Sequence, residues 1–454
     1  MKRGLMTDFM DVVSRDHPHV ASILPNFLRP LSPHLHPPKN LPLFPVVIPQ
    51  PKQGTWIIDE SVAPVDPSQD PFYTPDPSLY EHLENGDIIA IRRVGLSAVL
   101  SNASTSYQIS FRSESTSGSP TADLTVLIIP DHYDNKTLLS YQEAEDSAFL
   151  KCAPSYSVAS GDNDPLMNLA LNEGWALNIP DHQGISSAFA AGIYSGKTTL
   201  DSIRAVKNAE SMLGFSFENL GLHGYSGGSI ATGHALELQP SYAPDVTLTC
   251  AAVGGYIVNL TSTFETINGG LFAGFCPPAL IGLSTEYPEL DKMLQTAFRP
   301  GYRDRFYSSI HNCASGDLAN FLGQDIFTYV TAGNSFLYNS TVQDVLNENS
   351  LGKVAPSIPL FVYHGVRDEI APIAEVDKAV DFYCQSGARV EYSRQNSLAH
   401  LTTAVMSTQD VLNYFKRTFD GQLPANCASH QDAIDPHQHS PSLKDISTMI
   451  SRYL

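Results

Sequence analysis

The chain has 454 residues, of which 42% are hydrophobic and 16% are charged, so it is long enough to bury a large core. Lys and Arg number 27 against 47 Asp and Glu, and the net charge of −20 argues against nucleic acid or an anionic membrane surface as the main partner. No apolar run reaches the ~18 residues that a transmembrane helix needs.

Residues 1 to about 55 are rich in Pro and His, and this composition predicts an extended arm instead of a packed element. The first residues, MKRGLMTDFMDVV, are basic but lack the apolar segment of a signal peptide. From this start alone, we expect either a cytoplasmic protein or a true N-terminus that differs from the one printed.

Strand and helix signals alternate from 56 to about 260, which we predict to be the first part of an α/β core. TADLTVLIIP predicts a strand that ends at Pro130, and GWALNIPDHQG predicts a buried strand that leads to a turn. TTLDSIRAVKNAESML has the apolar spacing of a helix, and ENLGLHGYSGGSIATGHALEL predicts a strand, a sharp turn and a helix. Strands that alternate with helices indicate a mostly parallel sheet.

The alternation stops between 261 and 350, where aromatic, Gly- and Pro-containing pieces predict an inserted helical cap or lid. It returns from 351 to 425, the predicted second part of the core. There two strands (SIPLFVYHG and ARVEYSR) are each followed by a helix (EVDKAVDFYCQSG and TTAVMSTQDVLNYFKRTF). Residues 426–454 are predicted to form a polar tail. The expected fold is a mostly parallel central sheet flanked by helices, with the cap inserted between its two parts.

The chemistry centres on Gly224-Tyr225-Ser226-Gly227-Gly228, a G-x-S-x-G motif between a predicted strand and a predicted helix. In such an elbow the turn raises the serine hydroxyl above the sheet, and flanking glycines let the strand and the helix approach closely. The helix start also offers free N–H groups to a developing negative charge. We predict Ser226 as a nucleophile and the N–H of Gly227 as one oxyanion donor. An accidental structural turn is the alternative, and spacing alone assigns no second donor.

A serine nucleophile needs a general base, and in the α/β-hydrolase fold an acid and then a His follow the serine along the chain. Strand SIPLFVYHG leads into Asp368 and Glu369; we predict Asp368 as the acid and keep Glu369 as the alternative. His400 follows the next strand and is the predicted base, because the later histidines lie in the polar tail (His430, His437 and His439). His223 and His364 lie on predicted strands and are interpreted as buried packing residues.

The six cysteines show no CxxC pair and no Cys/His cluster with metal-binding spacing, so we predict no metal site. The serine chemistry needs no cofactor either. An even number of cysteines permits disulfides without establishing them. Sequons make four residues candidate glycosylation sites, which favours secretion only weakly: Asn102, Asn135, Asn259 and Asn339.

Beyond these single motifs, residues from about 70 to 425 resemble the fungal secretory lipases, α/β-hydrolases whose structural reference is a yeast lipase of the A type. Several long matches in one order make the resemblance specific. They include Asp70-Pro71-Phe72-Tyr73, the SYQEAEDS segment, Cys152-Ala153-Pro154-Ser155-Tyr156-Ser157, Gly174-Trp175-Ala176-Leu177, Pro180-Asp181-His182, the elbow, Asn268-Gly269-Gly270, Asp368-Glu369-Ile370 and Ala399-His400-Leu401-Thr402.

The resemblance implies the triad Ser226, Asp368 and His400, in agreement with the choice made from the residues. It also implies that Asp146 is the second oxyanion donor, through its own N–H or as a protonated carboxyl that Glu145 helps to keep protonated. It further implies secretion, buried free thiols at Cys250 and Cys276, and two disulfides, Cys152–Cys313 and Cys384–Cys427. The Pro-rich arm departs from the family pattern, as does Ala144, where the family has a tyrosine, and this leaves the acyl-chain length open.

We therefore expect a serine carboxylic-ester hydrolase that acts on acylglycerols or other small-molecule esters and contacts a lipid interface transiently through the cap. The family also holds esterases that deacetylate fungal secondary metabolites of the trichothecene type, and this activity is the alternative. A non-catalytic binding module is a third hypothesis, against which the intact triad argues. Acyl transfer and peptide hydrolysis also stay open, since fold and triad do not determine the acyl acceptor.

Overall fold

The computed structural model describes residues 57–96, 100, 102–161, 164–424 and 427–430. The predicted arm at 1–55 lies outside these residues, as do His437, His439 and most of the predicted tail. The described residues belong to one unit, Thr55–Leu454. Among them, no helix has the length and apolar character needed to cross a membrane.

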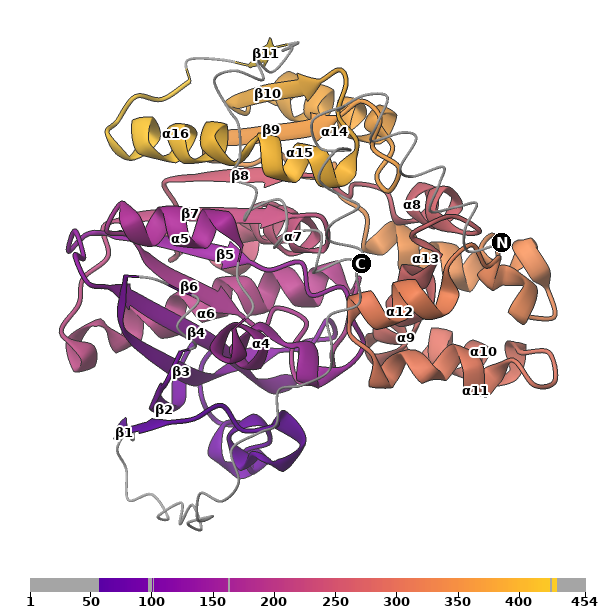
Figure 1. Cartoon of the computed structure of the whole chain (residues 1–454), viewed down its shortest axis with the longest axis horizontal. Coiled ribbons are helices and arrows are strands. Elements are labelled where there is room, and N and C mark those ends of the chain that lie inside the picture. The colour runs from indigo at the N-terminus through magenta and orange to yellow at the C-terminus, as the bar shows by residue number, and fades with distance from the viewer. Residues whose placement is uncertain (1–56, 97–99, 101, 162–163, 425–426, 431–454) are drawn as a thin grey trace, which may run out of the picture. The chain divides into compact units, whose positions relative to one another are not determined.

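Eleven strands of the described part form one mixed sheet in the order β1-β2-β3-β4-β6-β5-β7-β8-β9-β10-β11 (Figure 1). Every neighbouring pair from β6 to β11 is parallel, whereas β2–β3, β3–β4 and β4–β6 are antiparallel. The strand bounds are β1 Ile57–Val62, β2 Ile88–Val94, β3 Ala103–Glu114, β4 Pro120–Pro130, β5 Thr137–Gln142, β6 Ala176–Pro180, β7 Asn219–Tyr225, β8 Cys250–Gly254, β9 Leu360–Gly365, β10 Val390–Gln395 and β11 Ala428–His430. The prediction of a mostly parallel sheet is confirmed.

Helices cover both faces of the sheet (Figure 1), and its central strands are therefore buried on both sides. Alternate side chains of a strand enter different cores: Leu360 and Val362 of β9 pack into one, and Phe361 and Tyr363 pack into the other. The first core is completed by α6 Gly192–Leu213, α7 Gly227–Tyr242 and α14 Ile373–Gln385. The second is completed by α4 Pro154–Ser160, α5 Pro165–Asn172, α15 His400–Met406 and α16 Thr408–Phe419.

Most residues of a third core lie between β8 and β9 in the sequence, within a set of helices that we call the cap (orange in Figure 1). The others come from 188–194, from α7 and from the segment after β9. These helices are α8 Leu260–Ile267, α9 Cys276–Glu286, α10 Pro288–Ala297, α11 Arg303–Tyr307, α12 Ala314–Phe321 and α13 Ser340–Glu348, with the short 3-10 helix η5 Ala273–Phe275 before α9. The predicted division of the chain into arm, two core parts, cap and tail stays a prediction.

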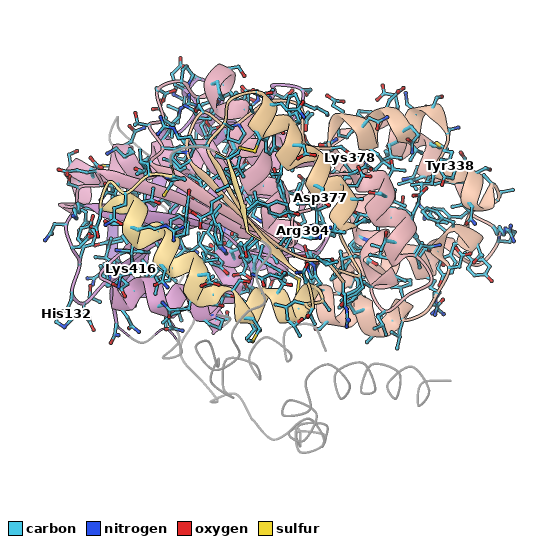
Figure 2. All side chains as sticks on the ribbon, turned by 90° about the horizontal axis from the view of Figure 1, so that it is seen from above. His132, Tyr338, Asp377, Lys378, Arg394 and Lys416 are labelled. Carbon is cyan, nitrogen blue, oxygen red and sulfur yellow. A yellow bond between two sulfur atoms is a disulfide. The ribbon has the colours of Figure 1, made fainter. Side chains whose placement is uncertain are left out.

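Local differences from the sequence prediction have physical reasons. The single helix predicted after His400 is two helices, because the chain turns at Ser407 between α15 and α16. Strand β11, which falls in the predicted tail, extends the sheet by pairing with β10. Arg394 of β10 also forms an ion pair with Asp377 of α14, 3.2 Å from Nε to Oδ1 (Figure 2).

Candidate active site

Ser226 stands at the turn between β7 and α7, where its φ of 53° lies in the left-handed region. A non-glycine residue in this region is strained, and such strain is typical of a nucleophile elbow. A Cβ on Gly224 would lie 2.1 Å from the carbonyl oxygen of Gly228, and a Cβ on Gly228 would lie 2.0 Å from that of Gln142. Glycine at both positions therefore lets α7 pack directly on β7 and β5.

Three predicted residues form one hydrogen-bonded chain. Ser226 Oγ lies 2.9 Å from His400 Nε2, and His400 Nδ1 lies 2.7 Å from Asp368 Oδ2. The serine is the N-cap residue of α7, the histidine begins α15, and the aspartate follows β9, so three separate elements converge on the site. With the imidazole between them, the hydroxyl can lose its proton to His400 while the carboxylate stabilises the imidazolium.

The Asp368 carboxylate is held by several groups. Its Oδ1 accepts the backbone N–H groups of Ile370 at 2.9 Å and Ala371 at 2.8 Å. His364 Nε2, 3.5 Å from Asp368 Oδ2, donates to the carbonyl of Ala371, because its Nδ1 accepts a backbone N–H. Burial opposes ionisation of Asp368, but the charge of His400 and these interactions outweigh burial and lower the pKa of Asp368 to about 2. The group is therefore ionised at neutral pH.

Glu369, the alternative acid, has a different position. Its Oε2 accepts the backbone N–H of His400 at 3.0 Å, while the ring of that histidine is paired with Asp368. The hydroxyl of Tyr225 donates to the His400 carbonyl at 2.6 Å, so both backbone groups of His400 are held. Burial lowers the pKa of His400, but the Asp368 carboxylate outweighs burial and raises it overall, as a base that must become an imidazolium requires.

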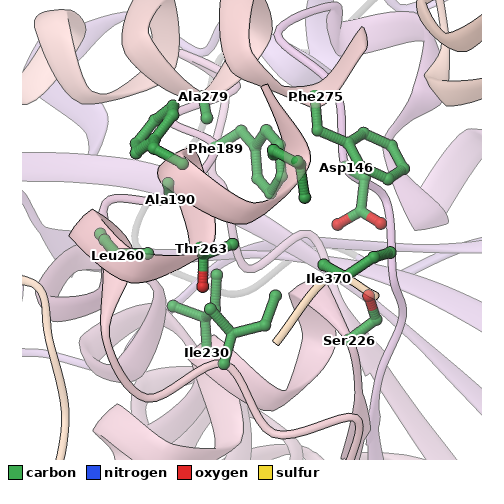
Figure 3. Close-up of a pocket in the computed structure, with 13 residues that line it drawn as sticks. Asp146, Phe189, Ala190, Ser226, Ile230, Leu260, Thr263, Phe275, Ala279 and Ile370 are labelled. Atoms are coloured by element: carbon green, nitrogen blue, oxygen red, sulfur yellow. The ribbon is translucent and has the colours of Figure 1, made fainter. Parts of the chain in front are cut away.

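Asp146 lies over the start of α7, beside the nucleophile. A Cβ on Gly227 would lie 1.8 Å from Asp146 Oδ1, and the Asp146 carboxyl group faces the Ser226 hydroxyl across the pocket (Figure 3). Asp146 itself has a φ of 49° and is buried. The structure thus brings both predicted oxyanion residues together. Burial, and then the nearby charge of Asp181, raises the pKa of Glu145 well above its usual range.

Near the segment that contains Glu143 and Asp146 lies a buried polar network, to which the sequence analysis assigned no role. Asp181 accepts the backbone N–H and the hydroxyl of Ser155 at 2.6 and 2.5 Å, and Ser155 Oγ also lies 2.7 Å from the Tyr73 hydroxyl. Burial raises the pKa of Asp181 to about 7. His182 Nε2 lies 2.8 Å from the carbonyl oxygen of Glu143, and burial lowers the pKa of His182 to about 4. Membership in the resemblance motifs was the only sequence signal for these residues.

An apolar pocket adjoins Ser226 (Figure 3). Three polar residues line it: Ser226, Asp146 and Thr263, whose hydroxyl donates to the carbonyl of Asn259 at 2.9 Å. The other lining residues come from the cap, from α7 and from core loops: Phe189, Ala190, Ile230, Ile257, Leu260, Phe264, Ile267, Phe275, Ala279 and Ile370. This lining suits an apolar acyl group.

The cysteines are paired as the resemblance implies. Disulfides join Cys152 to Cys313 and Cys384 to Cys427, and Cys250 and Cys276 are free and buried. Burial raises the pKa of both free thiols above the usual range. These two thiols are therefore packing groups and not nucleophiles.

The remaining predicted residues lie away from the hydrogen-bonded chain. Asn102, Asn135 and Asn339 are exposed, and the half-buried Asn259 caps α8 by accepting the N–H of Ser262; glycosylation of all four stays a prediction. His223 is buried with its Nε2 2.9 Å from the Tyr363 hydroxyl. His430 ends β11. Among the described residues, no three His, Cys, Asp or Glu side chains are grouped to hold a metal ion.

Comparison with known proteins is consistent with this site. The family model described as secretory lipase matches residues 153–426. Lipase A of Arthroderma benhamiae is 35% identical over 382 residues, which are 79% of this chain and 81% of the relative. Lipase 1 of Candida albicans is 35% identical over 381 residues, 78% and 81% of the two chains. A probable trichothecene esterase of Stachybotrys chartarum is 31% identical over 386 residues, which are 80% of this chain and 79% of the relative.

Solved structures are similar over most of the chain. Lipase A of Candida antarctica in its closed state superposes with a TM-score of 0.77 and 27% identity, covering 86% of this chain and 95% of that chain. The rice cell wall degrading esterase of Xanthomonas oryzae superposes with a TM-score of 0.63 and 16% identity, covering 75% of this chain and 100% of that chain. The second likeness concerns the fold alone, which is that of the α/β-hydrolases.

Proposed function

This chain belongs to the secretory lipase family, and we propose that it hydrolyses esters of apolar carboxylic acids through an acyl-enzyme on Ser226. Its named relatives are lipases and esterases, and the chain is a carboxylic ester hydrolase. The observation that carries the residue assignment is the chain of hydrogen bonds from Ser226 through His400 to Asp368 beside an apolar pocket.

The proposed reaction has two steps. His400 Nε2 takes the Ser226 proton as Oγ attacks the ester carbonyl, and Asp368 stabilises the imidazolium. The developing oxyanion is stabilised by the N–H of Gly227 and by Asp146. The alcohol leaves with the proton from His400, and water then attacks the acyl-enzyme by the same route. A protonated Asp146 carboxyl can donate to the oxyanion, as can the backbone N–H of Asp146.

The pocket lining favours an acyl chain longer than acetyl. The walls are apolar. Besides Ser226 and Asp146, the polar residue in the lining is Thr263, whose hydroxyl already donates to a backbone carbonyl. An acetyl group would leave most of this apolar surface without a partner, and burial of each CH₂ group contributes about 0.8 kcal/mol. Deacetylation of a metabolite is the second candidate, since the Stachybotrys relative is named a probable trichothecene esterase.

We also propose that the protein is secreted and touches lipid surfaces through the cap. The family is described as secretory, and two disulfides suit an oxidising compartment. Two tyrosines of the cap are exposed, Tyr338 at 58% (Figure 2) and Tyr302 at 41%. Aromatic rings of this kind favour membrane interfaces.

Hydrolysis of p-nitrophenyl acetate, butyrate and palmitate tests the proposal, with Ser226→Ala beside the native protein. The matched control is Ser241→Ala, at an exposed serine of the same helix. We expect activity that rises from acetate to the longer esters, that Ser226→Ala abolishes and that Ser241→Ala retains. Acetate-only activity would support the deacetylase candidate, and unchanged activity of Ser226→Ala would contradict the nucleophile assignment.

A further inference from the structure

Ser147 directly follows Asp146 and links the oxyanion loop to the cap. Its side chain is fully buried, and its Oγ donates a hydrogen bond of 2.8 Å to the carbonyl oxygen of Asn312, just before α12. The same Oγ accepts the backbone N–H of Phe149 at 3.2 Å. One hydroxyl therefore holds its own loop and a cap residue 165 positions away in the sequence.

A covalent link lies at the same place. Cys313, next to Asn312, is joined to Cys152 by the disulfide, and Ser147 Oγ lies 3.4 Å from Cys152 Sγ. Cys313 is also the N-cap residue of α12. The start of α12 is thus fixed to the core by a disulfide and to the oxyanion loop by a hydroxyl.

The same cap helix supports the wall of the acyl pocket. A Cβ on Gly274 in η5 would lie 2.5 Å from the carbonyl oxygen of Asp317 in α12, so these two backbones are in direct contact. The next residue, Phe275, lines the pocket. The segment 312–321 therefore contacts the oxyanion loop through Asn312 and supports η5, whose Phe275 lines the acyl site.

Asp146 needs such support from outside its own loop. Its φ of 49° is unfavourable for a residue other than glycine and persists only where the surroundings impose it. Ser147 is the adjacent residue, and its bond to Asn312 restrains the chain where it leaves Asp146.

We propose that Ser147 is a positioning residue: with the Cys152–Cys313 disulfide, its hydroxyl holds Asp146 over Gly227, so that the oxyanion site is complete only when the start of α12 is seated. This inference rests on the proposed function. The Asp146 contact acts on the transition state and not on the bound ester, so its loss lowers kcat and leaves KM nearly unchanged.

The test is Ser147→Ala, measured with p-nitrophenyl butyrate and with an alkyl trifluoromethyl ketone, which forms a tetrahedral oxyanion on the serine. We expect kcat to fall roughly ten- to a hundredfold with KM within about twofold, because a small displacement of a catalytic donor has effects of this size. The inhibition constant of the ketone rises by the same factor, a correlation that a general loss of folded protein does not produce.

Ser284→Ala is the matched control, since it removes another buried cap hydroxyl that donates to a backbone carbonyl, at 2.7 Å, away from the oxyanion loop. It should change neither constant. The double variant Cys152→Ser/Cys313→Ser should lower kcat in the same direction, and it carries the test alone if Ser147→Ala does not fold.

The inference would be overturned if the native protein is active and both Ser147→Ala and the double-cysteine variant have the native kcat. So would a fall in kcat without a weaker affinity for the ketone. Native protein that neither hydrolyses the ester nor binds the ketone would contradict the proposed function itself, and with it the role of Ser147.

Discussion

The carboxyl group of Asp146 occupies the space that a side chain on Gly227 would need, with 1.8 Å between Asp146 Oδ1 and a Cβ placed on Gly227. Asp146 follows β5 and Gly227 begins α7 after β7, and these two strands are parallel neighbours. The ends of two adjacent strands thus bring both proposed oxyanion donors close to Ser226. Glycine after the proposed nucleophile is therefore needed for this contact.

Replacement of Gly227 by Ala should therefore inactivate the enzyme without unfolding it. The new methyl group would displace the Asp146 carboxyl, and loss of one oxyanion donor lowers kcat by about 100- to 1,000-fold. Butyrate hydrolysis and circular dichroism of the purified variant check this. Gly270→Ala, whose Cβ would meet nothing closer than 3.3 Å, is the control, and native-like activity of Gly227→Ala would contradict the contact.

Substitution of Asp146 distinguishes the two groups that could donate a hydrogen bond to the oxyanion, its backbone N–H and its protonated carboxyl. If the carboxyl donates, Asp146→Ala loses about 100-fold or more in kcat, whereas Asp146→Asn retains part of the activity because the amide still carries N–H groups. The measurement is kcat for p-nitrophenyl butyrate at a pH near neutrality. Equal activity of Asp146→Ala and the native protein would show that the side chain is not the donor.

The sequence alone predicts much of this site, and the reasons are specific. An elbow needs glycines at fixed positions, so Ser226 is visible in the sequence, and Asp368 and His400 follow from chain order. The antiparallel strands β2 and β3 were missed, because alternation of strands and helices carries no information about an added antiparallel edge. Ser147 and Asp181 were not assigned roles, since their partners are distant in the sequence and only the fold brings them together.

Stability should fall as the pH rises from acid to neutral, owing in part to Asp181. Its folded pKa of about 7 lies above the ordinary value of 3.8, so its contribution is fully present below about pH 4 and is lost as the pH rises through about 7. The loss from this group between about pH 5 and pH 7 is on the order of 2 kcal/mol. Thermal unfolding at several pH values checks this, and Asp181→Asn should flatten the profile. A profile as steep in the variant would contradict the assignment.

Acyl-chain selectivity should respond to Ala279 of α9, which lines the pocket at a distance from Ser226 (Figure 3). Ala279→Phe fills that end of the pocket, so palmitate hydrolysis should fall by about tenfold or more relative to butyrate, as each lost CH₂ contact contributes about 0.8 kcal/mol. The ratio of kcat/KM for the two esters is the measurement. Thr285→Leu, an exposed position of the same helix, is the control, and an unchanged ratio in Ala279→Phe would place the acyl chain elsewhere.

The most direct test of the central claim is covalent labelling by an alkyl fluorophosphonate, followed by mass spectrometry of the intact chain and of its peptides. The account predicts a single adduct located on Ser226, no adduct in Ser226→Ala, and labelling slowed by about 1,000-fold or more in His400→Ala, because the serine is inert without its base. An adduct on another residue, or labelling of Ser226→Ala at the native rate, would contradict the assignment of Ser226 as the nucleophile.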